Sequence, residues 1–115
     1  MRSLRKLAAL CALALPMMAF GQGTATGTIT HLMISGTFGD LVYIELSGTK
    51  SSNPSCSTDS PWQFLLPRNN TEQFYTDMLN ILVSAYNKGT AVTITGVGSC
   101  TVSTTLETIN GLQTN

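Results

Sequence analysis

Cys56 and Cys100 are the residues of this 115-residue chain with the clearest chemical role. The third cysteine, Cys11, lies in an apolar N-terminal run, so two remain to pair with each other. Paired thiols persist as disulfides in oxidising compartments, and a bridge across a loop of about 45 residues contributes about 4 kcal/mol in the chain-entropy account. We therefore predict a disulfide between Cys56 and Cys100, with two free buried thiols as the alternative.

The other reactive side chains do not form a pattern that predicts catalysis. His31 is the only histidine, and the acidic residues have no spacing that predicts convergence. Nucleophilic catalysis needs a nucleophile beside a base, and zinc sites need several Cys, His or carboxylate ligands. The segment Gly96-Val97-Gly98 lacks the third glycine and the context of a dinucleotide-binding loop. We expect no enzyme activity, no metal and no cofactor, and His31 is expected to be a partly exposed sheet residue.

Residues 1–21 have the pattern of a signal peptide. Three basic residues precede an apolar run over 7–20, which is shorter than the roughly 18 to 20 residues that cross a bilayer. Ala19 and Gly21 provide the small residues that signal peptidase requires, so cleavage is expected after Gly21. No later stretch is apolar enough for a membrane span. We expect residues 22–115 to form a single domain in the periplasm or outside the cell.

The charge balance of the mature chain argues against nucleic acid as a partner. Loss of residues 1–21 leaves three basic and six acidic side chains, a net charge of about −3 with no charged blocks. Nucleic-acid binding needs clustered Lys and Arg. We therefore expect no nucleic-acid ligand.

The apolar pattern of the mature chain alternates between a period of two and a period of about 3.6. It predicts a helix over 71–87 and five strands, over 24–34, 41–46, 62–66, 91–95 and 101–109. Asn69 and Asn70 are expected to cap the start of the helix and Gly89 to end it. In the last strand, Val102 and Leu106 are expected to point inward.

The order β-β-β-α-β-β is that of the OB-fold, a five-stranded Greek-key barrel. We therefore predict a mainly β domain with one helix, in the form of a five-stranded OB-fold-like barrel. A plain antiparallel sheet covered by one helix would give the same pattern and is the alternative.

Four aromatic side chains could either stack on sugar rings or pack in a core. We favour the core for Trp62, Tyr75 and Tyr86, since large aromatic residues are highly buried on average. Both interpretations stay open for Tyr43, which lies on the polar face of its predicted strand.

Three segments resemble the B subunits of AB5 toxins of the subtilase-cytotoxin type and the small exported proteins that are similar to these B subunits. Residues 82–94 are similar to the end of their helix and the following strand, Thr26-Gly27-Thr28-Ile29 to the start of their first strand, and Val42-Tyr43-Ile44-Glu45 to their second. The resemblance implies a secreted OB-fold with a disulfide, a ring of five copies and recognition of sialylated glycans.

The resemblance also implies a candidate ligand site. In sugar-binding relatives a hydroxyl residue at the position of Thr26 contacts the acidic sugar, so Thr26 is the first candidate glycan contact. Tyr43 is a second candidate because of its expected exposure. The other polar residues of the sugar site are not recognisable in this sequence.

The hypothesis with the most support is an exported, non-enzymatic binding module that recognises a glycan or a protein partner, with a homopentamer as the assembly that the resemblance implies. The alternatives are a periplasmic structural or stress-related OB-fold protein without a sugar site and a small inhibitor of a secreted hydrolase. A glycan array, a molecular mass and a pull-down distinguish them.

Overall fold

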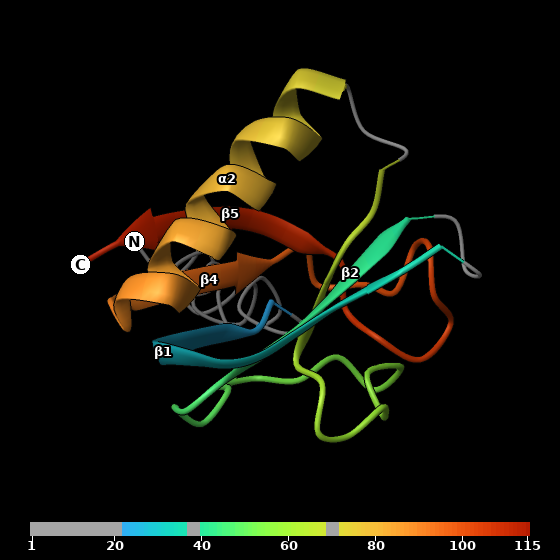
Figure 1. The fold of residues 1–115 in the computed structure, drawn as a ribbon. Coiled ribbons are helices and arrows are strands. Elements are labelled where there is room, and N and C mark those ends of the chain that lie inside the picture. Colours follow the sequence, from blue (N-terminus) through green and yellow to red (C-terminus); the bar gives the residue numbers. More distant parts are fainter. Residues whose placement is uncertain (1–21, 37–39, 69–71) are drawn as a thin grey trace, which may run out of the picture.

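The computed structural model describes residues 22–36, 40–68 and 72–115, which form one sheet and one long helix. The predicted signal peptide and the expected caps Asn69 and Asn70 lie outside the described residues. The elements follow the predicted order (Figure 1) and are β1 (Thr24–Ser35), β2 (Leu41–Leu46), β3 (Phe64–Leu66), α2 (Glu72–Lys88), β4 (Ala91–Gly96) and β5 (Ile109–Thr114).

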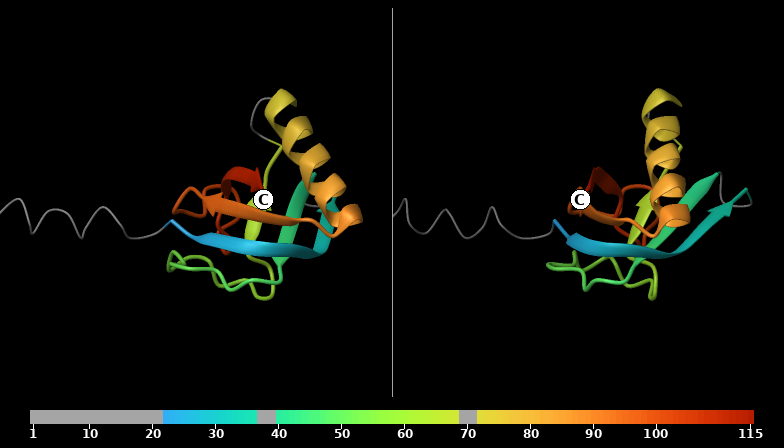
Figure 2. Two further views of the ribbon diagram at one scale, coloured as in Figure 1. Left: turned by 90° about the vertical axis from the view of Figure 1, so that its left-hand side faces the viewer. Right: turned by 60° about the vertical axis from the view of Figure 1, so that its left-hand side comes forward.

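The five strands form one antiparallel sheet in the order β3-β2-β1-β4-β5. β1 is long enough to pair with both of its neighbours: Thr24–Thr28 pairs with β4, and Ile29–Ser35 pairs with β2, with a register shift between Ile29 and His31. Extra residues at such a shift bend the strand and increase its twist. Helix α2 lies on one side of this curved sheet, and the long loop between β2 and β3 lies on the other (Figure 2).

The sheet is open, so the closed barrel expected from the sequence does not form. The two edge strands meet only beside Leu65, which forms an isolated parallel bridge with Thr108. The Leu65 N–H donates to the carbonyl of Glu107 at 2.9 Å. β3 is only three residues long, and beyond this one contact it is too short to continue pairing along β5.

Two apolar clusters pack on opposite faces of the sheet. The larger cluster fills the space between the sheet and α2 and includes Val42, Ile44, Phe64 and Leu82, each fully buried. The smaller cluster lies on the other face, under the loops, and its members are Leu41, Tyr43, Leu65 and Leu106, with the partly buried Trp62 and Val102 packed against them. β2 is therefore buried on both faces.

Helix α2 begins and ends within one residue of the predicted helix. It buries Tyr75, Met78, Leu82 and Ala85, a spacing of three to four residues that places them on one face. The helix ends at Lys88, and Gly89 follows it with a φ of 66°, the left-handed conformation that glycine adopts without strain. The prediction of a core position for Tyr86 is wrong: this residue is 46% exposed, because it lies at the border of the buried face.

The predicted last strand is displaced along the chain. The sequence predicts it over residues 101–109, but β5 is Ile109–Thr114, and residues 99–106 form turns. The difference results from hydrogen bonds to the disulfide loop: the Thr105 carbonyl accepts the N–H groups of Thr58 and Asp59 at 2.9 and 3.0 Å. This segment therefore pairs with the disulfide loop and not with the sheet, although Leu106 still points inward as expected.

The predicted disulfide is present. Cys56 and Cys100 are joined by an S–S bond of 2.05 Å, with their Cα atoms 6.1 Å apart. The bridge connects the loop between β2 and β3 to the loop between β4 and β5. These two loops cover the face of the sheet opposite α2, and a cis peptide bond between Ser60 and Pro61 lies in the first of them.

Candidate functional site

The two candidate glycan contacts from the sequence do not form a common site. Thr26 is exposed in the part of β1 that pairs with β4, and its hydroxyl lies 2.9 Å from that of Thr93. Tyr43 lies opposite Met33, in the other half of β1. Seven residues of strand between positions 26 and 33 correspond to roughly 20 Å.

Tyr43 is not the exposed residue that the alternation of β2 predicts. Its exposed fraction is 8%, and its ring packs against Trp62 with the ring centroids 5.8 Å apart and the planes tilted by 60°. The loops that cover this face of the sheet bury it. Tyr43 therefore supports Trp62 and has little free surface for a ligand.

His31 is an exposed sheet residue, as expected from the sequence. Its Nδ1 contacts the carboxylate of Glu45, which also accepts a hydrogen bond of 2.7 Å from the Thr30 hydroxyl. The hydrogen bonds from Thr30 and His31 lower the pKa of Glu45 below 4.5. Within residues 22–36, 40–68 and 72–115, no group of three or more His, Cys, Asp or Glu side chains is placed to hold a metal ion.

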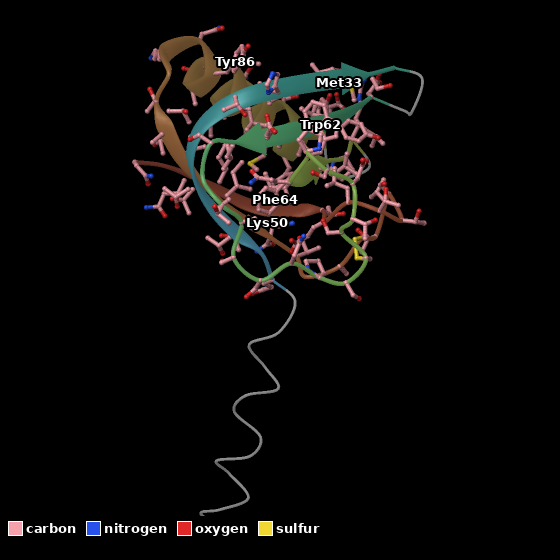
Figure 3. The ribbon with its side chains drawn as sticks, turned by 90° about the horizontal axis from the view of Figure 1, so that it is seen from below. Met33, Lys50, Trp62, Phe64 and Tyr86 are labelled. Atoms are coloured by element: carbon pink, nitrogen blue, oxygen red, sulfur yellow. A yellow bond between two sulfur atoms is a disulfide. The ribbon has the colours of Figure 1, made fainter. Side chains whose placement is uncertain are left out.

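The most unusual polar feature of the structure is a buried ion pair between Lys50 and Glu107. Lys50 Nζ lies 2.8 Å from Glu107 Oε1, and the two side chains are 6% and 0% exposed. The ammonium also donates to the Gln63 carbonyl at 2.8 Å and lies 4.5 Å from the centre of the Phe64 ring. Figure 3 shows Lys50 beside Phe64, under the loop that follows β2.

The second oxygen of Glu107 is held by backbone donors from two chain segments. Oε2 accepts the N–H of Gly23 at 3.1 Å and the N–H of Gly98 at 2.8 Å. Oε1 has the Lys50 ammonium as its only polar contact in the described part of the chain. Removing two charges from water is costly unless they are paired and hydrogen-bonded, and this carboxylate meets that requirement through three contacts.

Two glycines leave the space that the carboxylate occupies. A Cβ at Gly96 would overlap the Glu107 side chain, and a Cβ at Gly23 would overlap both Lys50 and Glu107. The Gly96 N–H also donates to the Gly23 carbonyl at 2.8 Å. The ion pair is therefore enclosed by the start of β1, the end of β4 and the loop that follows β2.

Burial is the main influence on the protonation of Lys50. Desolvation lowers the pKa of Lys50 below 10.5, and the hydrogen bond and charge of Glu107 oppose this shift. The sequence does not point to this pair, because Lys50 and Glu107 are two of a few dispersed charges, 57 positions apart. Only the fold brings them together.

A cavity of about 410 Å³ lies directly beside the ion pair, between the disulfide loop and the start of β3. Among the described residues that line it, Trp62 is the only aromatic one, and Lys50 of the ion pair also borders it. The remaining lining is rich in hydroxyl, amide and carboxylate groups and consists of Thr49, Asn53, Ser57, Thr58, Asp59, Ser60, Pro61 and Gln63. We refer to this space as the Trp62 cavity.

Hydrogen bonds hold the wall of the Trp62 cavity in place. The side chain of Gln63 accepts the Leu46 N–H at 2.8 Å and donates to the Gly48 carbonyl at 2.9 Å. Asn53 Nδ2 donates to the Ser57 carbonyl at 3.1 Å. Together with the disulfide at Cys56, these contacts give an irregular loop a defined shape.

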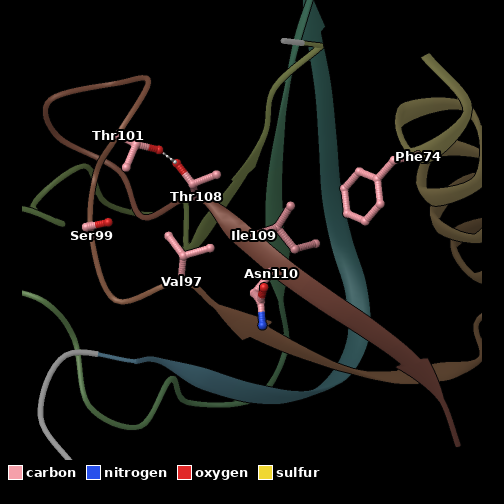
Figure 4. Close-up of a pocket in the computed structure, with 7 residues that line it drawn as sticks. All are labelled: Phe74, Val97, Ser99, Thr101, Thr108, Ile109 and Asn110. Carbon is pink, nitrogen blue, oxygen red and sulfur yellow. Dashed lines mark hydrogen bonds between the residues drawn. The ribbon is translucent and has the colours of Figure 1, made fainter. Parts of the chain in front are cut away.

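Two further cavities lie beside α2, one near each end of β5. One, of about 500 Å³, lies between Phe74 of the helix and the loop between β4 and β5 (Figure 4). Its other lining residues are Val97, Ser99, Thr101 and Thr108 of that loop and Ile109 and Asn110 of β5. The other, of about 330 Å³, is bordered by Ile81 and Lys88 of α2 and by Thr114 at the far end of β5, together with Asn80, Ser84, Ala85 and Thr90.

Comparison of the chain with protein-family models, curated proteins and solved structures finds no match. Among the described residues, no helix has the length and apolar character needed to cross a membrane.

Proposed function

We propose that this protein is an exported, non-enzymatic binding domain that holds a neutral glycan in the Trp62 cavity. The observation that carries the proposal is the combination, in one cavity of about 410 Å³, of an indole ring with closely spaced hydrogen-bonding groups. Sugars present flat C–H surfaces and many hydroxyl groups, so an aromatic wall and a polar lining match both parts of the ligand.

The charges of the cavity favour a neutral sugar over an acidic one. Asp59 lines the cavity and, when ionised, only accepts hydrogen bonds. The Lys50 ammonium is already paired with Glu107 and offers little to a second carboxylate. The resemblance to toxin B subunits implies sialylated ligands, and the proposal departs from it on this point.

The rigidity of the cavity supports a role in binding. A preformed site loses less conformational entropy when the ligand binds, and the loop that carries Asp59 is fixed by the disulfide and by the hydrogen bonds of Asn53 and Gln63. A disulfide is also typical of exported proteins. On this proposal the protein acts in the periplasm or outside the cell, with a ring of five copies as the assembly suggested by the resemblance.

A glycan array tests the proposal. Oxidised protein comprising residues 22–115 is applied to an array of neutral and sialylated glycans, alongside Asp59→Asn and Trp62→Phe variants whose melting temperatures are measured first. We expect neutral glycans to bind, and Asp59→Asn to weaken binding by roughly 10-fold or more, since a hydrogen bond to a charged group contributes about 1.5 to 3 kcal/mol.

Thr26→Ala is the matched control. Thr26 is exposed on β1 and does not line the Trp62 cavity, so this variant should bind as the wild type does. Loss of binding in Thr26→Ala but not in Asp59→Asn would move the site to the position implied by the toxin resemblance. Absence of any glycan signal would refute the proposal, and a monomeric mass by light scattering would refute the ring.

A further inference from the structure

β5 has one unpaired edge. Its residues pair with β4 on one side, and no other strand in the described part of the chain pairs with Ile109–Thr114 on the other. The single bridge between the two edges of the sheet involves Thr108, the residue before β5 begins. From Ile109 to the end of the strand, the outer edge is therefore free.

The hydrogen-bonding register shows which backbone groups face outward. In an antiparallel pair, residues bonded to the neighbouring strand alternate with residues that are not. The Asn115 N–H donates to the Ala91 carbonyl of β4. Because the pattern repeats every second residue, Gln113 and Gly111 also form backbone hydrogen bonds with β4. The N–H and C=O groups of Leu112 and Thr114 consequently point to the open edge.

This edge lacks the features by which proteins usually prevent strand addition. Natural edge strands carry charged residues, prolines or bulges that block pairing with another chain. The sequence of β5 is Ile-Asn-Gly-Leu-Gln-Thr, with neither a charge nor a proline. The register shift in its pairing with β4 lies at its first residue, opposite Gly96, and leaves the rest of the edge regular.

Helix α2 crosses over β5, and a cavity lies beside each end of the strand. We refer to the open edge of β5 together with these two cavities as the β5 groove. The cavity at Phe74 lies at the start of β5, beside the loop that precedes the strand, and the cavity at Ile81 lies at the end of β5. The six residues of β5 extend over roughly 20 Å. Figure 1 shows α2 crossing in front of β5 at an angle.

We propose that this groove binds an extended peptide segment of a partner protein, which adds to β5 as a sixth strand. The outward groups of Leu112 and Thr114 would bond to the peptide backbone, and alternate peptide side chains would enter the cavities at Phe74 and Ile81. Main-chain bonds then provide affinity and the cavities provide specificity, as in other cases of strand addition.

The charge of the groove defines the peptide further. Among the described residues, Lys88 is the only charged one that lines either cavity, and it lies at the Thr114 end. Its ammonium also complements the negative end of the helix dipole at the C-terminus of α2. The peptide is therefore uncharged and alternately apolar along its length, with an acidic residue at the end that meets Lys88. This groove is separate from the Trp62 cavity, so the inference does not depend on glycan binding.

Synthetic seven-residue peptides test the inference. The probes are fluorescein-labelled peptides of alternating Val and Thr that end in either Glu or Lys, and fluorescence anisotropy measures their binding to oxidised protein comprising residues 22–115. We expect the peptide with Glu to bind at least 3-fold more tightly than the peptide with Lys. Lys88→Glu should reverse this preference.

A backbone test separates strand addition from other modes of binding. In one peptide, the alternate N–H groups that would face β5 are N-methylated, which removes those donors and should weaken binding at least 10-fold. In a second peptide, the N–H groups that would face away from β5 are N-methylated instead, which should have little effect. Thr114→Pro removes one outward N–H of the protein without removing a bond to β4, and it should also weaken binding. Gln113→Ala is the control, because only its exposed side chain changes.

The possible results decide between occupants. Equal binding by both N-methylated peptides, or no binding by any probe, would overturn the proposal. A dimeric mass that becomes monomeric in Thr114→Pro would assign the β5 edge to a second copy of this chain and would also overturn it. Unchanged melting temperatures of Lys88→Glu and Thr114→Pro are needed in each case, and Gln113→Ala must bind as the wild type.

Discussion

Replacing Glu107 with Gln should strongly destabilise the fold while preserving the shape of the side chain. The carboxylate faces the Lys50 ammonium with one oxygen and the N–H groups of Gly23 and Gly98 with the other. An amide has one acceptor oxygen and one NH₂ group. Whichever way the amide of the variant is turned, its NH₂ meets a donor, and Lys50 loses its counter-charge.

The expected loss is large compared with the stability of a small domain. Removing one partner of a buried ion pair costs roughly 3 to 5 kcal/mol, because the other charge stays buried without compensation. Typical domains are stable by about 5 to 15 kcal/mol. A change of 1 kcal/mol shifts the melting temperature of a domain this size by about 4 to 8 °C, so Glu107→Gln should melt at least about 12 °C below the wild type.

Urea and thermal unfolding, followed by the fluorescence of Trp62, measure the effect. Glu72→Gln is the control: Glu72 is 66% exposed and pairs with Arg68 at 3.0 Å on the surface, and such exposed pairs contribute about 0 to 1 kcal/mol. A free energy of unfolding for Glu107→Gln that lies within about 1 kcal/mol of the wild type would refute the reasoning. A buried Lys50 ammonium without its counter-charge should cost more than that.

Three further predictions concern the same fold. Gly96→Ala should lower the melting temperature clearly, because the added Cβ would overlap the buried carboxylate of Glu107. Gly111→Ala is the control, since no atom lies within 4 Å of its Cβ position, and it should change the free energy of unfolding by less than about 0.5 kcal/mol. Equal effects of the two substitutions would contradict this packing. The double variant Cys56→Ser/Cys100→Ser should have a free energy of unfolding about 4 kcal/mol lower than the wild type, because the bridge closes a loop between cysteines 44 positions apart. An unchanged midpoint of chemical denaturation would show that the bridge does not stabilise the fold. Glu45→Gln should reduce acid destabilisation: hydrogen bonds lower the pKa of Glu45 below 4.5, so the stability that it contributes is present above that pH and is lost as the pH falls through the lowered pKa. Melting curves that show the same acid dependence in wild type and variant would count against this.

The sequence predicts those parts of the fold in which local pattern and tertiary environment agree. Leu41–Leu46 alternates between apolar and polar residues and forms β2 with the predicted bounds. Helix α2 combines a 3.6-residue apolar period with Gly89 as its end signal, and it lies within one residue of the predicted range. The prediction of the disulfide rests on the expected export and on the number of cysteines, which are read from the sequence without any knowledge of the fold.

Other features depend on contacts between distant segments and could not be predicted in this way. Thr101 to Leu106 has the composition of a strand, yet its backbone pairs with the disulfide loop. Tyr43 lies on the polar face of its strand, but loops cover that face and bury it. The Trp62 cavity likewise consists of loop residues without a periodic pattern, and their convergence is a result of the fold.

The enclosure of Lys50 and Glu107 constrains how this sequence can diverge. Gly23 and Gly96 have no space for a side chain as long as the carboxylate is present, so a change at any one of these four positions alters the requirements at the other three. Distant descendants of a common ancestor should therefore keep or replace the four residues together. The joint presence of two glycines, a lysine and a glutamate at this spacing would identify a relative even when overall identity has become too low to align.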